Sequence, residues 1–196
     1  MRRLNKMTYE DIIAYNLRDG GTAVTIFADA QTQRVDLARK LISNIIADEP
    51  GRKLIIEPGC SAGDISGYFS QDHDVQGFDV SPAAVAATRE RYPLMKVSED
   101  VVENVTPVPC DILVLCEFME HLADPIGLAK AWIPLAKHVV IGHPLVGDGM
   151  DPEQGHVWAY DVQDFVDWFV IGGHGLVEAW EFPMGYRMVI GRGKRK

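Results

Sequence analysis

The 196-residue chain has few cysteines and no apolar run long enough to cross a membrane. Its three cysteines, Cys60, Cys110 and Cys116, are an odd number without the spacing of a disulfide framework or a zinc site. A membrane span needs roughly 18 apolar residues, and the N-terminal Arg-Arg pair precedes polar residues instead of a signal-peptide core. We therefore expect a reducing, cytoplasmic location and no membrane partner.

Positive charge is also scarce in this sequence. Lys and Arg number 19 against 28 Asp and Glu, which gives a formal net charge of −9 at pH 7. An acidic chain repels the phosphate backbone, so a nucleic-acid partner is disfavoured and a small-molecule substrate is favoured. Basic residues gather at the two ends, at Arg2 and Arg3 and over residues 192–196, where we expect frayed, solvated segments.

Internal repeats, low-complexity tracts and a Pro/Gly/Ser-rich linker are all missing. The length suits one globular domain with one core, and 47% of the residues are hydrophobic. We expect a single domain over residues 1–196, with a helical segment at 1–48 and a sheet core at 53–192. Two helices, predicted at 8–17 and 31–48, are expected to fold over the carboxyl edge of the sheet as a lid.

Residues 53–66 have the pattern of a buried strand, a glycine turn and a helix. The apolar run at 54–56 is typical of a central parallel strand that is covered on both faces. Gly59 and Gly63 bracket a turn that brings backbone close to a ligand. A helix predicted over 62–70 would point its free N–H groups and positive dipole end into this turn. The combination predicts a nucleotide-type pocket at the carboxyl end of a sheet.

The rest of the chain alternates between short apolar strands and helices. Strands are predicted at 75–79, 94–98, 111–117, 138–142, 176–182 and 187–192, and helices at 82–91, 125–133 and 160–171. Ser81-Pro82 and Asp124-Pro125 mark the starts of two of these helices, because a capping side chain precedes a proline at the first helical position. The short connection between the last two strands requires antiparallel pairing. These elements predict an α/β sheet with an antiparallel end.

The turn itself carries a resemblance to a known family. The stretch from Glu57 to Gly63, Glu-Pro-Gly-Cys-Ser-Ala-Gly, resembles the first motif of the class I S-adenosylmethionine-dependent methyltransferases. That motif is an acidic residue followed by Gly-x-Gly-x-Gly, and Ser61 replaces the middle glycine here. The resemblance covers about residues 30–192 and implies a Rossmann-like seven-stranded sheet of order 3-2-1-4-5-7-6 with its last strand antiparallel. An NAD site is disfavoured because the G-x-G-x-x-G fingerprint is absent.

The resemblance also assigns roles to the strand ends. Asp79 would accept hydrogen bonds from both ribose hydroxyls and Asp100 from the adenine amino group, while Glu57 would fix the turn or help hold the methionine amino group. Arg34 resembles a lid residue that pairs with the cofactor carboxylate, and a solvated helix charge is an equal alternative. The implied cofactor is S-adenosylmethionine, with S-adenosylhomocysteine as product. The residues expected to line it are Arg34, Glu57, Gly59, Cys60, Gly63, Asp79, Val80, Asp100, Val101, Cys116 and Glu117.

The block Glu117-Phe-Met-Glu-His121 is similar to a Glu-x-x-Glu-His segment of ubiquinone-biosynthesis O-methyltransferases, the branch closest in motif style, and of small-RNA 3′-end methyltransferases. In those relatives it can hold a divalent metal, so Glu117, Glu120 and His121 are the metal candidates. A metal is the least favoured role for His121, behind a base or substrate contact and a structural histidine. His143 and His156 are expected at the same edge. The candidate catalytic residues are Glu120, His121, His143 and His156.

Together these patterns predict methyl transfer from S-adenosylmethionine to oxygen or nitrogen of a small-molecule acceptor. Two alternatives stay open. One is methylation of an RNA 3′ end through a metal at Glu117, Glu120 and His121, which a basic surface beside the pocket would favour. The other is a non-catalytic protein that keeps the cofactor site. A narrow apolar pocket walled by Trp158 and Tyr160 would favour a small acceptor.

Overall fold

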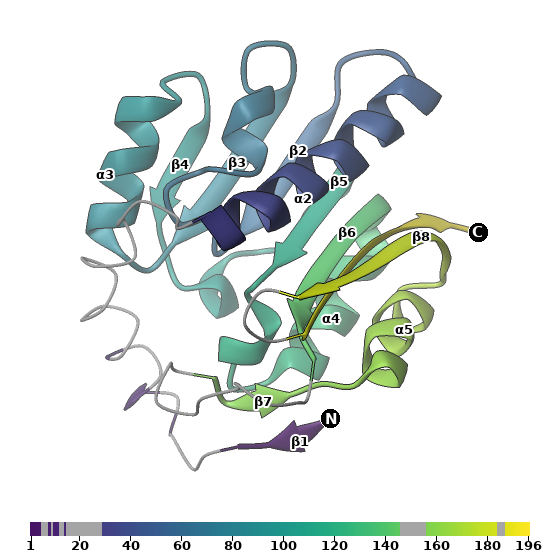
Figure 1. The fold of residues 1–196 in the computed structure, drawn as a ribbon. Coiled ribbons are helices and arrows are strands. Elements are labelled where there is room, and N and C mark those ends of the chain that lie inside the picture. Colours follow the sequence, from purple (N-terminus) through teal and green to yellow (C-terminus); the bar gives the residue numbers. More distant parts are fainter. Residues whose placement is uncertain (5–7, 9, 12–13, 15–28, 146–155, 184–186) are drawn as a thin grey trace.

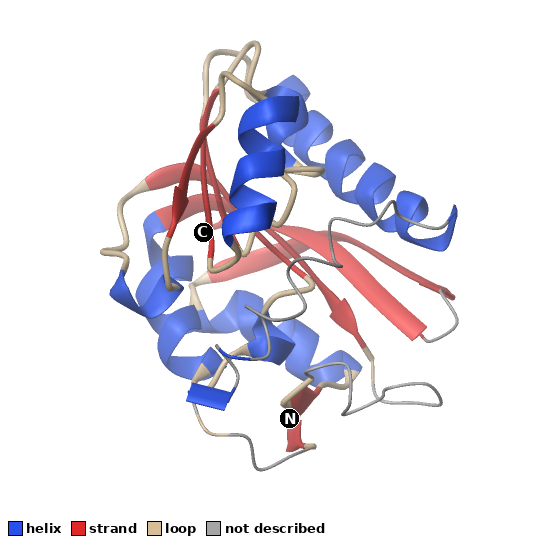
Figure 2. Ribbon diagram, turned by 90° about the vertical axis from the view of Figure 1, so that its left-hand side faces the viewer, coloured by secondary structure: helices blue, strands red, loops and turns tan. Residues whose placement is uncertain are grey.

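The computed structural model describes residues 1–4, 8, 10–11, 14, 29–145, 156–183 and 187–196. In this part of the chain a seven-stranded sheet lies between layers of helices, and a two-stranded ribbon lies beside it (Figures 1 and 2). No helix among these residues is both long and apolar enough to cross a membrane.

The large sheet has the topology expected from the sequence. Its strands are β2 (Leu54–Pro58), β3 (Asp74–Asp79), β4 (Lys96–Glu99), β5 (Cys110–Cys116), β6 (Ala136–Pro144), β8 (His174–Pro183) and β9 (Arg187–Arg195). They are arranged in the order β4-β3-β2-β5-β6-β9-β8. Neighbouring strands from β4 to β6 are parallel, whereas β9 runs antiparallel to both β6 and β8. The predicted order 3-2-1-4-5-7-6 with an antiparallel last strand is confirmed.

Helix α2 (Asp29–Asp48) crosses one face of this sheet (Figure 1). Ala38, Leu41, Ile42 and Ile45 are fully buried at the spacing of one helical face, and they pack with residues of the central strands. Burying each of the three larger side chains stabilises the fold by roughly 1.5–3 kcal/mol. The segment that we expected in a lid is therefore largely a core helix. Most of the helix predicted at 8–17 lies outside the described residues.

The opposite face is covered by α4 (Pro125–Trp132) and α5 (Val162–Ile171), whose aromatic side chains enter a second core cluster. Helix α3 (Pro82–Arg91) and helix α4 begin at the expected capping residues. Ser81 Oγ accepts from Ala84 N at 3.3 Å, and Asp124 Oδ1 accepts from Gly127 N at 2.8 Å. These side chains satisfy N–H groups that the first helical turn leaves without partners, so the predicted starts of α3 and α4 are confirmed.

The helix predicted over 62–70 is wrong. Only η1 (Ser66–Phe69), one turn of 3-10 helix, forms there. Gly63 has a φ of +75°, which interrupts right-handed helical backbone, and a Cβ on Gly67 would lie 2.6 Å from the Tyr92 ring. Two glycines in so short a segment also lower its helix propensity by roughly 1 kcal/mol each.

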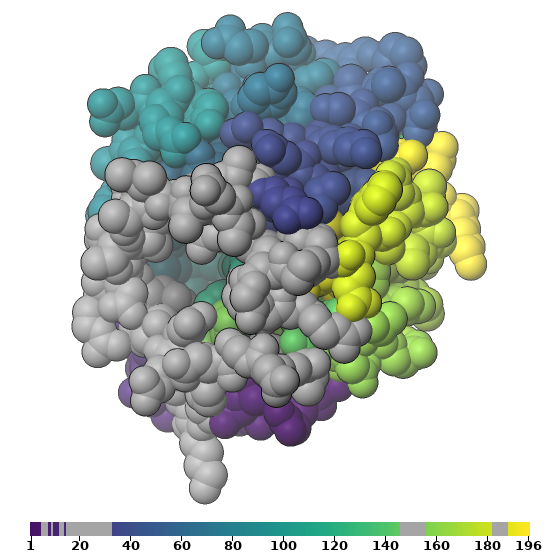
Figure 3. All heavy atoms as spheres, viewed as in Figure 1, coloured from purple at the N-terminus to yellow at the C-terminus, as the bar shows by residue number. Residues whose placement is uncertain are grey.

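The chain ends are not frayed, contrary to our expectation. β1 (Arg2–Arg3) pairs antiparallel with β7 (Trp158–Ala159), and the N-terminal residues lie along the lower edge of the molecule in Figure 3. At the other end, Arg192 pairs with Asp48 at 2.9 Å and Lys194 with Glu49 at 2.7 Å. These basic residues are therefore held by strand pairing and by ion pairs with the C-terminal end of α2.

Candidate functional site

The turn after β2 depends on two glycines. Gly59 and Gly63 have φ of +65° and +75°, the left-handed region that favours glycine. Gly59 N donates to Phe78 O on the neighbouring strand at 2.8 Å. A Cβ on Gly59 would lie 2.3 Å from Phe118 Cδ2, and one on Gly63 would lie 2.9 Å from Thr88 Cγ2. Both positions therefore require glycine for backbone conformation and for close packing.

Ser61 occupies the middle of the same turn with a φ of +46°. A non-glycine residue rarely adopts this conformation, which explains why the compared motif has glycine there. The backbone of Ser61 is held at both groups, because its N–H donates to Asp79 Oδ2 at 2.8 Å and its carbonyl accepts from Thr88 Oγ1 at 2.8 Å. Contacts with β3 and α3 thus hold Ser61 in the left-handed backbone conformation that suits the glycine it replaces.

Asp79, the last residue of β3, lies across this turn. Its Oδ2 accepts from Ser61 N, and its Oδ1 accepts from Ser81 N at 2.9 Å. Burial raises the pKa of the Asp79 carboxyl group, and the backbone N–H donors oppose that shift. A carboxylate offers about four acceptor positions, so this one is oriented by the backbone and can accept further donors.

The end of β4 is joined to the end of β3. Asp100 N donates to Asp79 O at 3.0 Å, and Asp100 Oδ1 accepts from Val101 N at 3.0 Å. Asp100 is exposed, while Val80 and Val101 are half-buried. The structure therefore brings Asp79, Val80, Asp100 and Val101 together at one edge of the sheet.

Glu57 is buried beneath the turn. Its Oε2 accepts from Ser66 N at 3.1 Å and from the Ser66 hydroxyl. Burial raises the pKa of Glu57 to about 7, although both hydrogen bonds favour the charged form. Cys60 and Cys116 are buried nearby in the core that α2 covers, and burial raises the pKa of both thiols. They have the environment of packing residues instead of reactive thiolates.

Arg34 and Glu117 meet above this edge. Arg34 Nη1 lies 3.3 Å from Glu117 Oε2, and the two side chains are 11% and 16% exposed. Arg34 is therefore not the solvated helix charge that we considered. Glu117 has a φ of +52°, and its N–H donates to Gly142 O at 2.8 Å. This backbone turns the chain sharply after β5 and presents the carboxylate to α2.

A second group of side chains lies just beyond, in η3 (Met119–His121) and at His156. Glu120, His121 and His156 each offer one ligand atom, and these atoms lie within 4.8 Å of one another. The rings of His121 and His156 have centroids 5.0 Å apart. We call Glu120, His121 and His156 the Glu–His cluster. The metal candidates from the sequence included Glu117 in place of His156, but Glu117 pairs with Arg34.

Glu120 is the most constrained member of the Glu–His cluster. Its side chain is 0% exposed, and neither carboxylate oxygen has a hydrogen-bond partner among the described residues. Burial, and then the charge of Glu117, raise the pKa of Glu120 well above its ordinary range. Ligand atoms around a bound cation lie roughly 3–4 Å apart, so a small contraction of the cluster would accommodate one. His156 was missed as a ligand because it lies 35 positions after His121 in the sequence.

His143 does not join the Glu–His cluster. It is fully buried between the rings of Tyr160 and Phe165, at centroid distances of 4.7 and 5.7 Å. Its Nδ1 lies 3.0 Å from Pro144 O, and burial lowers its pKa to about 4. These surroundings keep the ring neutral within an aromatic core. The acidic residues Asp148, Asp151 and Glu153, which follow His143 in the sequence, lie outside the described residues.

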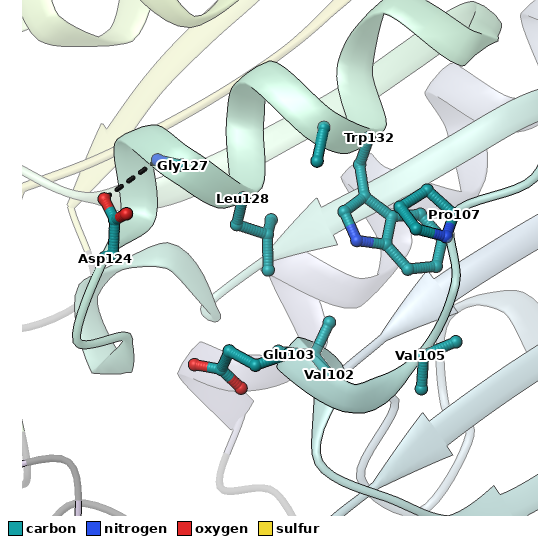
Figure 4. Close-up of a pocket in the computed structure, with 9 residues that line it drawn as sticks. Val102, Glu103, Val105, Pro107, Asp124, Gly127, Leu128 and Trp132 are labelled. Atoms are coloured by element: carbon teal, nitrogen blue, oxygen red, sulfur yellow. Dashed lines mark hydrogen bonds between the residues drawn. The ribbon is translucent and has the colours of Figure 1, made fainter.

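A shallow groove of about 240 Å³ lies between η2 (Val102–Asn104) and α4 (Figure 4). Val102, Leu128 and Trp132 line it with apolar surface, and the carboxylates of Glu103 and Asp124 lie at one end. This groove is not the pocket between Trp158 and Tyr160 that we considered. Tyr160 is fully buried in the core.

The sequence matches no protein-family model and no curated protein. Several solved structures have a fold similar to that of this chain. The magnesium protoporphyrin IX methyltransferase of Synechocystis, with bound SAM, aligns with a TM-score of 0.77 at 12% identity, over 98% of this chain and 100% of that chain.

Two further solved structures align nearly as well. The 1,6-didemethyltoxoflavin-N1-methyltransferase of Burkholderia thailandensis, with bound 1,6-didemethyltoxoflavin and S-adenosylhomocysteine, has a TM-score of 0.70 at 12% identity over 100% of this chain and 93% of that chain. The N-methyltransferase NodS of Bradyrhizobium japonicum, in complex with S-adenosylhomocysteine, has a TM-score of 0.69 at 15% identity over 95% of this chain and 97% of that chain. At these identities the similarity concerns the fold, and the chain has the Rossmann-like fold of class I methyltransferases.

Proposed function

We propose that the chain binds S-adenosylmethionine at the carboxyl ends of β2 to β5 and transfers its methyl group to a small molecule. Asp79 carries this proposal. Backbone N–H groups hold both of its oxygens, and its remaining acceptor positions suit the two hydroxyls of a ribose. Neighbours of the same fold that hold the donor or its product support the choice of ligand.

The other residues of this edge fit the two ends of that ligand. Asp100, with Val80 and Val101 beside it, would contact adenine. Glu57, under the glycine turn, and the pair of Arg34 and Glu117 would bind the methionine end, whose ammonium and carboxylate match their charges. Gly59, Gly63, Cys60 and Cys116 would line the space between these two ends.

Methyl transfer forms a bond from acceptor oxygen or nitrogen to the methyl carbon while the carbon–sulfur bond breaks. Such a displacement needs alignment, exclusion of water and removal of the acceptor proton. We assign removal of the acceptor proton to the Glu–His cluster, with the imidazole of His121 or His156 as the base. His143, which we expected to contribute, is a structural residue in this proposal because aromatic rings enclose it.

The binding proposal is tested by calorimetry with Asp79→Ala. We expect at least tenfold weaker binding of S-adenosylmethionine, because a buried hydrogen-bonding partner of a diol contributes about 1.5–3 kcal/mol. Asp74→Ala is a matched control, since Asp74 begins the same strand and pairs with the exposed Arg52 at 2.9 Å. Equal affinities for the two variants would contradict the assignment. Labelled methyl transfer into metabolite pools would then separate an enzyme from a protein that only binds the cofactor.

A second candidate is methyl transfer assisted by a divalent cation. It is favoured by the buried carboxylate of Glu120, which lies beside two imidazoles. Glu120, His121 and His156 would hold the ion, which would lower the pKa of a coordinated acceptor hydroxyl. The RNA 3′-end version of this function has less support, because Arg192 and Lys194 are engaged in ion pairs.

Equilibrium dialysis with Mn²⁺ and Co²⁺ tests the cation directly. We expect binding by the wild type that Glu120→Gln and His156→Ala each weaken at least tenfold, because every ligand contributes to a site of this size. Glu103→Gln removes an exposed carboxylate near α4 and should leave binding unchanged. Equal binding by all four proteins would place the ion elsewhere and contradict the site.

A further inference from the structure

The conformation of η3 cannot come from its own residues. It is a three-residue turn of 3-10 helix, preceded by Glu117 in the left-handed region and by Phe118 at φ −136° and ψ −47°. So short a helix makes few backbone hydrogen bonds of its own, such as the 3.4 Å bond from Leu122 N to Met119 O, and isolated helical turns are unstable. Tertiary contacts must therefore determine where Glu120 and His121 lie.

Those contacts come from the segment that follows His156. Three donors of this segment reach three carbonyls in and just after η3. Tyr160 Oη donates to Met119 O at 2.8 Å, Val157 N to Glu120 O at 2.8 Å, and Trp158 Nε1 to Leu122 O at 2.7 Å. The segment that carries His156 thus also holds the backbone of the other two members of the Glu–His cluster.

The N-terminal strand braces this segment from its other side. Leu4 N donates to Val157 O at 2.8 Å, and Arg3 is paired with Trp158 in the β1–β7 ribbon (Figure 1). The Arg3 guanidinium also lies over the Trp158 ring, 5.5 Å from its centroid. Val157 therefore links η3 to the N-terminal strand, because its N–H donates to Glu120 O and its carbonyl accepts from Leu4 N.

We propose that residues 2–4 and 157–160 form a clasp that holds the Glu–His cluster together, with Trp158 and Tyr160 as positioning residues. Neither side chain has to touch the acceptor. Each acts through a backbone carbonyl of the turn that presents Glu120 and His121. The catalytic consequence rests on the proposed function, whereas the geometry of the clasp does not.

The clasp is tested by removing its donors while keeping its rings. Trp158→Phe loses the indole N–H, and Tyr160→Phe loses the hydroxyl. In the wild type, selectively labelled histidines should show a nuclear Overhauser effect between the rings of His121 and His156, whose centroids are 5.0 Å apart. We expect the double variant to lose at least half of this signal and to turn over about tenfold more slowly, as two lost hydrogen bonds imply.

Two further variants make the test specific. Trp180→Phe removes an equivalent indole N–H, which donates to Glu178 at 3.2 Å on the distant β8, and should leave the histidine signal unchanged. Leu4→Pro removes the N–H that binds Val157 without altering any residue of the cluster, and should weaken the signal. An unchanged signal in the folded double variant and in Leu4→Pro would overturn the clasp.

Failure of the clasp can be distinguished from failure of the proposed function. The affinity for S-adenosylmethionine should be the same in the wild type and in the clasp variants, because the hydrogen bonds removed from the clasp reach carbonyls in and just after η3. If the wild type did not bind S-adenosylmethionine, the proposed function would fail while the histidine signal still tested the clasp. If the wild type lacked the signal, the clasp would fail while cofactor binding stood.

Discussion

The glycine turn after β2 and the Glu–His cluster are built in different ways, although both lie at the carboxyl edge of the sheet. The turn is held by the adjacent strand, through the carbonyl of Phe78 and the carboxylate of Asp79. The cluster joins η3 to a histidine far along the chain, and the first residues of the protein brace it from outside. Neighbouring strands thus organise the cofactor side, whereas long-range contacts organise the acceptor side.

The two regions touch where Gly59 lies against Phe118, so Gly59→Ala should have the largest effect. A methyl group there would meet Phe118 at 2.3 Å in backbone with φ +65°. We expect a loss of about 2–5 kcal/mol in the free energy of unfolding, from left-handed strain and overpacking together. Urea denaturation measures this loss.

Gly173→Ala separates the two causes. Gly173 has a similar φ of +72°, but no described atom lies within 4 Å of the added methyl group. We expect this variant to lose only about 1–2 kcal/mol, the cost of left-handed backbone. Equal losses of unfolding free energy at the two positions would show that the close contact between Phe118 and Gly59 adds nothing to the cost of the substitution.

The buried Glu57 should make the stability of the turn region depend on pH. Its pKa of about 7 in the folded protein is above the ordinary value, so its contribution is full below about pH 4 and is lost as pH rises through 7. Between pH 5 and 8 the wild type should lose about 2–3 kcal/mol from this group. Glu57→Gln should remove that slope in urea titrations, while Glu90→Gln, at an exposed site on α3, should keep it.

Ser61→Gly should have the smallest effect of these substitutions. It tests whether the glycine turn is held by its backbone groups, as the contacts with β3 and α3 indicate. Glycine adopts φ +46° without strain, and the described contacts of Ser61 at the turn use its N–H and carbonyl groups. We expect a gain of up to about 1 kcal/mol in the free energy of unfolding, after the entropy cost of glycine. Ser98→Gly, in the extended strand β4, should instead be destabilised, and a loss at both positions would contradict the strain argument.

Most of the sheet could be predicted because its signals are local. The apolar runs of β2 and β5, the helical spacing from Ala38 to Ile45 and the capping signal at Ser81 each depend on a few adjacent residues. The helix over 62–70 failed because Gly63 adopts a left-handed conformation that the apolar pattern does not report. The paired chain ends were missed because Arg2 and Arg3 find their partners only in the folded protein.

The sequence by itself determined the strands, the α/β class and the glycine turn, because strand periodicity and turn chemistry act over short distances, whereas the strand order and the place of Asp79 were implied by the family resemblance. Only the tertiary structure decided that Arg34 pairs with Glu117, that His156 joins Glu120 and His121, and that His143 is enclosed by aromatic rings. Contacts between distant segments leave no periodic pattern in a sequence. They form when separate elements pack against the same sheet, so the fold alone brings those side chains together.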